Sequence, residues 1–550
     1  MKKHSIQLFS LVIFFFLTVS AQKNQQNSNK LQNLFKEWRS FEIPPIKSGA
    51  PDYRKITFDK RFSEFLKLKS KLCNINKSSL STEEKVDWTL IWAEMNGYLF
   101  NYKVLKPWER DPAFYKTIWT SRSDVPAHEG PSHHNLVELW KYKFPLNSVD
   151  KLKLISDLKV IPNLNKQAKQ NLIGNARDLW ITGIRTIKRQ SSDLKSLLKR
   201  IDPLDKGISK VIIDAISSTN EFVGWLEKEA INKNGPSGIG KENYTWYQKN
   251  VHLVPLTWEQ EVILLKNELA RAWTSLKYEE KNNSKLPYLS AVNNSKEYDE
   301  LAKKSAEELL SFLDDQKIIT VKPYYKDALQ PHLGKFIPKY KRNFFWITAH
   351  YDPKPLYSHF FHWFELAQMD IDPHKNEIRR KPLLYNIFDS RSEGVATAVE
   401  ELFMQAGLYK NNPRAREIVY ILIAQRAARG LGSLYAHANI MSMEEAGKIH
   451  SEYTPRGWMK TEKDLLIFEQ HLYLRQPGYG TSYITGKYLL ESAIADYSKI
   501  NEEENSKEII KDFFDLLMSI GNIPMTLVHW QMTNSNAHIK DLINECELNL

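Results

Sequence analysis

Signals for helix starts recur along almost the whole sequence, and they constrain its fold more than any other feature. In a capping box, a Ser or Thr side chain and a Glu or Gln three residues later each bond the backbone N–H of the other. Four such pairs precede stretches of helical periodicity: Ser81 with Glu84, Thr257 with Gln260, Ser305 with Glu308, and Ser442 with Glu445. Strand-like alternation is scarce, and residues 317–325 and 343–348 are its best candidates. The sequence therefore predicts a mainly α fold with few short strands.

The N-terminus has the pattern of a secretory signal peptide. Lys2 and Lys3 precede an apolar run over residues 8–17, and a small-residue cleavage site ends at Ala21. We therefore expect residues 1–21 to be removed and the mature protein to be exported, either to the periplasm or out of the cell. No cysteine stands near the cleavage site for a lipid anchor, and no later apolar stretch is long enough to span a membrane.

The remaining chain predicts a lead-in followed by one long helical unit. Residues 22–50 are polar and contain two adjacent prolines, which predicts a flexible segment, with a short helix over residues 31–38 as the alternative. The chain of 550 residues is long enough to bury a sizeable core. We expect residues 51–550 to form a single helical domain, with the functional site in residues 340–532.

Charge and cysteine content narrow the function classes. The formal net charge is +12, and the basic residues are scattered, so an exported protein of this kind is not expected to bind nucleic acid. Cys73 and Cys546 are the only cysteines. The sequence leaves open whether they form a disulfide or are both free, and it does not assign an oligomeric state.

A His-x-x-His pair is the first candidate for metal binding. Ser358 is a good N-cap residue, and a helix that begins there places His359 and His362 three residues apart on one face. The surrounding residues are aromatic, so a hydrogen-bonded polar spot in an aromatic core stays open as the alternative interpretation.

The matching carboxylates lie on a second predicted helix. Ser390 and Glu393 match a capping box, and the helix is expected to end before Gly407. Glu393 and Glu400 lie two turns apart on one stripe of this helix. Two histidines from one helix and a carboxylate from another are a workable set of zinc ligands. The sequence thus predicts a zinc site formed by His359, His362 and Glu393.

Further polar groups are predicted around this site. In a helix that starts near residue 416, Arg429 and His437 lie on one face, where Arg429 could bind a substrate carboxylate and His437 could donate to an oxyanion. A glycine-containing loop after the next helix could bring Tyr479 or Tyr483 to a cleft. The sequence has no Gly-x-Ser-x-Gly motif, so serine hydrolase chemistry has no support.

Four groups of residues together match the patterns of one bacterial family. They are Arg391-Ser392-Glu393-Gly394 with Glu400-Glu401, residues 426–429 with His437, Tyr473 with Pro477-Gly478 and Tyr483, and residues 514–517 with Gly521 and Pro524. In these patterns, the chain resembles the family called domain of unknown function 885, whose members look like zinc metallopeptidases. The resemblance covers most of the mature chain and is strongest over residues 344–532. It implies a helical metallopeptidase-like domain with a central cleft, a zinc cofactor and a peptide substrate.

One family motif is altered in this chain. Members carry His-Glu-x-x-Pro-Gly-His-His, in which the glutamate looks like the general base. Here His359 is kept, Phe360 stands at the base position, and Glu365-Leu366 replace the paired histidines. A metal-bound water needs a nearby group to accept its proton, and phenylalanine cannot do so.

Three interpretations follow from this departure. In the first, the chain is a divergent metallohydrolase, in which His359, His362 and Glu393 hold zinc and Glu365 or Glu400 acts as the base.

In the second, the chain is a catalytically inactive relative that binds peptides or envelope components. In the third, Arg429, His437 and Tyr483 carry out a reaction without metal. For a peptide ligand, Arg429 is the expected carboxylate contact, and Trp363, Tyr473 and Tyr483 are the expected apolar walls.

Overall fold

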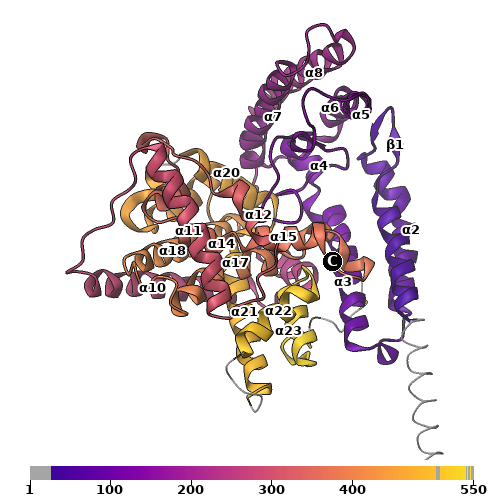
Figure 1. Cartoon of the computed structure of the whole chain (residues 1–550). Coiled ribbons are helices and arrows are strands. Elements are labelled where there is room, and N and C mark those ends of the chain that lie inside the picture. Colours follow the sequence, from indigo (N-terminus) through magenta and orange to yellow (C-terminus); the bar gives the residue numbers. More distant parts are fainter. Residues whose placement is uncertain (1–26, 462, 503–507, 541, 543–545, 547–550) are drawn as a thin grey trace, which may run out of the picture.

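The computed structural model describes residues 27–461, 463–502 and 508–540 together with Leu542 and Cys546, and its fold is mainly α, as predicted (Figure 1). Within these residues the only sheets are two pairs of very short strands. The antiparallel pair is β1 (Ile46–Lys47) and β2 (Ala50–Pro51), and the parallel pair is β3 (Ile118–Trp119) and β4 (Val137–Glu138). The predicted signal peptide, residues 1–21, lies outside the described residues.

Helices account for most of the chain from residue 27 onward, and the first covers residues 27–42. Besides short 3-10 helices, the further helices of the N-terminal half are α2 (Lys55–Cys73), α3 (Thr82–Phe100), the π-helix η2 (Asn101–Leu105), α4 (Pro107–Arg110), α5 (Ser148–Leu158), α6 (Val160–Asn171), α7 (Arg177–Leu198), α8 (Lys206–Ala230), α9 (Lys241–Tyr247), the π-helix η5 (Gln248–His252) and α10 (Trp258–Asn282). Those of the C-terminal half are α11 (Ser295–Asp315), α12 (Tyr325–Leu329), α13 (Phe344–Tyr351), α14 (Lys354–His359), α15 (Phe361–Ile371), α16 (Glu377–Arg380), α17 (Asp389–Gln405), α18 (Ala415–His437), α19 (Met443–Glu452), α20 (Lys463–Arg475), α21 (Tyr479–Ile500), α22 (Ile509–Ile520) and α23 (Met525–Thr533).

Three of the four predicted capping boxes are confirmed, at the starts of α3, α10 and α19. The prediction at Ser305 is wrong, because α11 begins ten residues earlier. Its N-cap is Asn294, whose side chain accepts a hydrogen bond from the backbone N–H of Glu297. Ser305 therefore lies buried in the helix interior.

Both strand predictions are wrong. Residues 316–324 have no regular structure, and Tyr325 begins α12. Residues 344–348 belong to α13, whose N-cap Asn343 accepts a hydrogen bond from the backbone N–H of Trp346. The aromatic and β-branched residues of this run have strand propensity, but a strong cap and burial of Phe344 and Thr348 against the core favour the helix.

The segment predicted as a flexible lead-in is instead helical over residues 27–42. Leu31 and Trp38 on this helix are fully buried and belong to the main hydrophobic core. The end of α2 is joined to the far end of the chain, because Cys73 and Cys546 form a disulfide with a Cα–Cα distance of 5.9 Å. This contact settles the pairing that the sequence left open.

Three helices, α17, α18 and α21, form the interior of the C-terminal half. α18 buries 21 of its 23 residues, so it is covered on all sides. α17 and α21 touch through their backbones where Gly394 meets Gly486, since a Cβ atom on Gly394 would lie 2.4 Å from the Gly486 Cα. No described helix is both long and apolar enough to cross a membrane.

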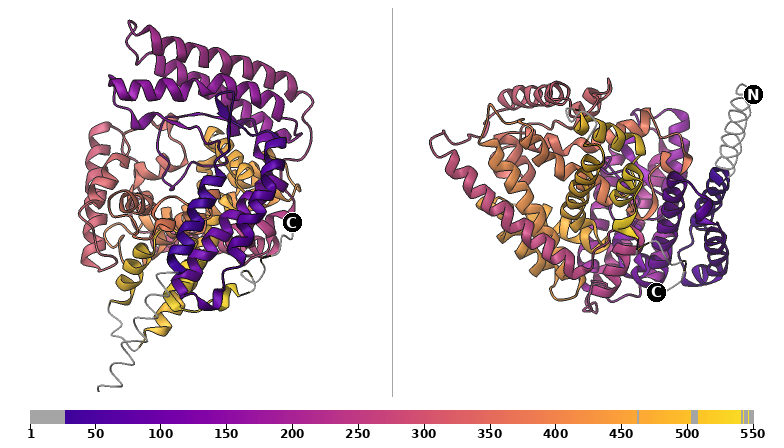
Figure 2. Two further views of the ribbon diagram at one scale, coloured as in Figure 1. Left: turned by 90° about the vertical axis from the view of Figure 1, so that its right-hand side faces the viewer. Right: turned by 90° about the horizontal axis from the view of Figure 1, so that it is seen from below.

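The peripheral part of the molecule contains α5 to α8. In Figure 1 α7 and α8 lie side by side at the top, and Figure 2, left, shows them as a separate layer of the molecule. Their contacts form a second, smaller apolar cluster, which includes Leu154, Leu194, Leu197, Ile208 and Ile212. The candidate site lies in the interior part, away from this layer.

Candidate metal centre

Two histidines and one glutamate meet where α14, α15 and α17 adjoin. His359 is the last residue of α14, His362 lies in the first turn of α15, and Glu393 lies in α17. All three are buried, and their ligand atoms lie within 4.8 Å of one another. Among the described residues this is the only group of His, Cys, Asp or Glu that meets this criterion. The structure thus brings together the three ligands predicted from the sequence.

The local structure around the ligands differs from the sequence prediction. The two histidines do not share one helix, because α14 ends at His359 and Phe360 separates it from α15. Ser358 lies inside α14, where its hydroxyl donates to the Lys354 carbonyl. Ser390 is not an N-cap either, since it lies inside α17 and accepts a hydrogen bond from the backbone N–H of Met525.

The spacing of the ligand atoms suits a zinc ion. Nε2 of His362 lies 3.1 Å from Oε2 of Glu393, and Nε2 of His359 lies 3.6 Å from the same oxygen. Tetrahedral zinc with ligand distances of about 2.0–2.1 Å places neighbouring ligand atoms roughly 3.3 Å apart. Both distances to the Glu393 oxygen are therefore close to those of a zinc site, and the ligand atoms of the two imidazoles lie within 4.8 Å of each other.

The outer nitrogen of each imidazole also has a partner. Nδ1 of His359 lies 3.1 Å from Oε1 of Glu400 and 3.2 Å from Nη2 of Arg426, and Nδ1 of His362 lies 3.2 Å from the Ser392 hydroxyl. Both oxygens of Glu400 accept from Arg426, at 2.6 and 2.7 Å. Groups that hold Nδ1 in this way direct the Nε2 lone pair toward a metal.

The three side chains are electrostatically coupled. Burial alone would lower the pKa of His362, but the Glu393 carboxylate outweighs this effect and raises that pKa to about 9. Burial would likewise raise the pKa of Glu393, but His362 and His359 hold it well below its usual value. Without a metal the cluster is therefore an ion pair, in which zinc would replace a proton.

Tyrosines and an arginine form one wall of the cavity beside the cluster, which has a volume of about 260 Å³. Tyr479 donates to Oε1 of Glu393 at 2.5 Å, and Tyr483 donates to the Tyr479 hydroxyl at 3.2 Å. The Arg429 guanidinium lies 3.7 Å from the Tyr483 ring centroid and donates to Glu469 at 2.8 Å. Tyr479 and Tyr483 thus line the cavity, as the sequence suggested, but from the first two turns of α21 rather than from a loop.

Two carboxylates in this cavity were missed by the sequence analysis. Asp124 and Glu129 lie between β3 and β4, and both line the cavity together with His359 and Tyr479. Glu129 is more than 200 residues from the ligands and follows no recognisable motif. Its neighbour Gly130, adjacent to Pro131, was the only local signal of an ordered turn.

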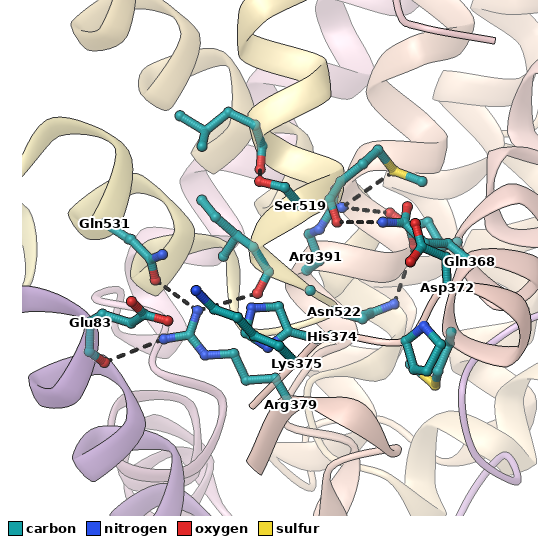
Figure 3. Close-up of a pocket in the computed structure, with 17 residues that line it drawn as sticks. Glu83, Gln368, Asp372, His374, Lys375, Arg379, Arg391, Ser519, Asn522 and Gln531 are labelled. Carbon is teal, nitrogen blue, oxygen red and sulfur yellow. Dashed lines mark hydrogen bonds and ion pairs between the residues drawn. The ribbon is translucent and has the colours of Figure 1, made fainter. Parts of the chain in front are cut away.

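Glu365 lines a different cavity from the one beside the candidate metal centre. This cavity of about 480 Å³ is drawn in Figure 3, with Arg391 and Asn522 on its wall. The Glu365 carboxylate pairs with Arg391 at 2.9 Å and accepts from Asn522 at 3.2 Å. None of the three candidate metal ligands lines it. Glu365 is therefore badly placed to be the base that the sequence analysis proposed.

Three other predicted residues also have different surroundings from those expected. Glu400 is engaged by Arg426 through both oxygens, which suits it to positioning His359 and not to accepting a proton. Nε2 of His437 lies 2.8 Å from the Tyr473 carbonyl, and His437 does not line the cavity. Trp363 stacks on His332 with ring centroids 3.4 Å apart and is likewise absent from the cavity wall.

Comparison with known proteins identifies the fold and nothing more. No family model matches the chain, and no curated protein matches it. Its structure is similar to that of a protein of unknown function from Shewanella oneidensis, provisionally described as a lipoprotein, with a TM-score of 0.65 and 14% sequence identity over 93% of this chain and 99% of that one. A second protein so described, from Colwellia psychrerythraea, gives a TM-score of 0.65 and 14% identity over 96% of this chain and 100% of that one. The chain shares the full-length fold of these two proteins.

Proposed function

We propose that this chain is an exported zinc-dependent peptidase that acts on short peptides. The observation that carries the proposal is the arrangement of His359, His362 and Glu393, in which Nε2 of both imidazoles faces one carboxylate oxygen while Nδ1 of each has its own partner. A group built of buried ligands with oriented outer atoms is typical of a metal centre. It also agrees with the resemblance to domain of unknown function 885.

In this proposal, polar side chains of the cluster and of the cavity beside it have distinct tasks. His359, His362 and Glu393 would hold zinc, which polarises a carbonyl group and lowers the pKa of a bound water. Glu400 and Ser392 keep the imidazoles in the required tautomer. The cavity of about 260 Å³ admits a small part of a peptide, and Arg429 on its wall is the candidate contact for a terminal carboxylate.

Export is supported by two features of the chain and by its similar structures. The N-terminal sequence has the pattern of a signal peptide. The disulfide between Cys73 and Cys546 is of the kind that persists in oxidising compartments such as the periplasm. The two similar structures, described as lipoproteins, are consistent with an exported protein.

Metal content tests the proposal directly. We expect about one zinc per chain in protein purified without chelator or affinity metal, and none in a His359→Ala, His362→Ala double variant. A His332→Ala, His374→Ala double variant is the matched control, because both residues lie outside the cluster. Absence of zinc from the native protein, even after zinc is added back, would contradict the proposal.

A second candidate function is that of a peptide-binding protein without catalysis. It is favoured by the position of Phe360 where the family has its base, and by the pairing of Glu365 and Glu400 with arginines. Calorimetry with unblocked tripeptides separates the two candidates. Binding to the zinc-loaded protein without any cleavage product, as measured by mass spectrometry, would favour this function over the first.

A further inference from the structure

We infer that Glu129 is the general base of this site, supplied by the segment between β3 and β4 in place of the glutamate lost at Phe360. The inference rests on the proposed peptidase function. It assigns the missing catalytic group to a part of the chain that carries no other residue of the proposed metal centre.

The segment that carries Glu129 is fixed at both ends and near its middle. Its ends are the paired strands β3 and β4. The backbone N–H of Gly130 donates to the Gln476 side chain at 2.9 Å, and the Pro131 carbonyl accepts from Arg475 at 2.7 Å. The His128 carbonyl accepts from Asn386 at 3.3 Å. These contacts hold the neighbours of Glu129 on both sides, so its side chain has a defined place in the cavity.

Glu129 lines the cavity beside the candidate metal centre, where a peptide and a water molecule would have to bind, but it is not one of the three candidate ligands. It shares the cavity with His359 and Tyr479, yet it is not part of the group whose ligand atoms lie within 4.8 Å of one another. Its one hydrogen bond among the described residues is a long one, 3.5 Å, from the Ser123 hydroxyl, and no described cation forms an ion pair with it. By contrast, Glu365 and Glu400 each pair with an arginine.

The electrostatic surroundings of Glu129 suit proton transfer near neutral pH. Burial, followed by the negative charges of Asp124 and Glu393, raises the pKa of Glu129 to about 8, and Lys116 and the Ser123 hydroxyl oppose this only in part. A base works best when its pKa lies near the working pH, because it must both accept a proton and release it.

The proposed step uses only peptide and water. The ionised form of Glu129, whose share grows as the pH rises toward its pKa of about 8, takes a proton from the water molecule as the water oxygen bonds to the carbonyl carbon of the peptide. The C–N bond then breaks, and the same proton passes from Glu129 to the amine nitrogen. The products are a carboxylic acid and an amine, and Glu129 returns to its starting state.

The first test compares Glu129→Gln with Asp124→Asn, a matched loss of one carboxylate in the same cavity. We expect both variants to retain about one zinc per chain, because neither residue is a ligand. Hydrolysis of a mixture of unblocked tripeptides should fall about 100-fold or more in Glu129→Gln and much less in Asp124→Asn. A zinc-loaded Glu129→Gln protein with activity within about threefold of the native protein, or a larger loss in Asp124→Asn, would overturn the inference. Native protein without zinc would instead overturn the proposed function.

A second test does not depend on turnover. The raised pKa means that folded Glu129 keeps its proton between pH 4.5 and about 8, whereas the unfolded chain releases it, so stability is lost across this range as pH rises. In metal-free protein, the Tm of Glu129→Gln relative to the native protein should therefore increase from pH 5 to 8 and then level off. A difference that is constant with pH would overturn the placement of Glu129 in the cavity.

Discussion

α8 and α17 are both long helices of one molecule, but they are stabilised in different ways. α8 buries 7 of its 25 residues, and these follow a helical stripe of mainly apolar side chains from Ile208 to Leu226. α17 buries 15 of its 17 residues, among them charged side chains such as Arg391, Glu393 and Glu400. The first helix needs only an apolar neighbour, whereas the second needs a specific polar partner for almost every turn.

The partners of α17 come from distant parts of the chain. Glu400 pairs with Arg426 of α18, and Arg391 pairs with Glu365 of α15. Glu401 is bonded by Arg271 of α10 at 2.7 Å through each oxygen. Because burying an unpaired charge is costly, these contacts tie the interior helices to one arrangement and therefore hold the candidate metal ligands in place.

The largest expected difference in the free energy of unfolding is between removing a buried ion pair and removing an exposed one. Arg426→Met leaves Glu400 charged and buried, and we expect it to lower the free energy of unfolding by about 3–5 kcal/mol. Lys210→Met on α8 removes a pair with Asp214 in which both side chains are mostly exposed, and it should leave the free energy of unfolding unchanged. Denaturant melts of metal-free protein measure both. Equal free energies of unfolding for the two variants would show that the interior charges do not stabilise α17 in the way described.

A smaller effect is expected from two glycines, one in α21 at its contact with α17 and one on α8. At Gly486 an added Cβ would lie 2.2 Å from the Ser390 carbonyl oxygen, so Gly486→Ala must push α21 away from α17 and should cost about 2–3 kcal/mol. Gly224 on α8 has no atom within 4 Å of such a Cβ, so Gly224→Ala should stabilise the protein by about 0.5–1 kcal/mol. Thermal melts of the two variants should therefore shift in opposite directions. A shift in the same direction would contradict the close contact of α17 with α21.

The smallest expected effect concerns pH. Glu261 of α10 is buried beside Thr481 and Thr485 of α21, and burial raises its pKa to about 7 despite hydrogen bonds from these hydroxyls. Its raised pKa means that stability is present below pH 4.5 and is lost as the pH rises toward 7. Glu261→Gln should remove this loss, so its Tm advantage should be a few degrees larger at pH 8 than at pH 5. A pH-independent difference would show that Glu261 is ionised in the folded protein like an exposed carboxylate.

Local signals in the sequence predicted the helices well. Ser81, Thr257 and Ser442 each cap a helix through contacts with residues three positions away, so short-range reasoning was sufficient. The same reasoning failed at Ser358 and Ser390, because both lie in a region where packing of the surrounding helices decides where a helix begins.

For a related reason, the sequence predicted the three candidate metal ligands but not the other carboxylates of the cavity. His359, His362 and Glu393 lie within 35 residues of one another and belong to recognisable motifs. Glu129 comes from a segment without periodicity, and only the tertiary fold brings it to the cavity. The roles expected for Glu365 and His437 depended on side-chain direction, which spacing along a helix does not determine at a junction of several helices.

The disulfide between Cys73 and Cys546 turns almost the whole described chain into a covalent ring. The two cysteines are 473 positions apart in sequence, so the ring includes every helix from α3 to α23. A protease that cuts any exposed loop within it produces two fragments that stay linked. Such a nicked molecule would keep its mass until the disulfide is reduced, and the segment that carries Glu129 could not diffuse away from the helices that carry His359 and Glu393.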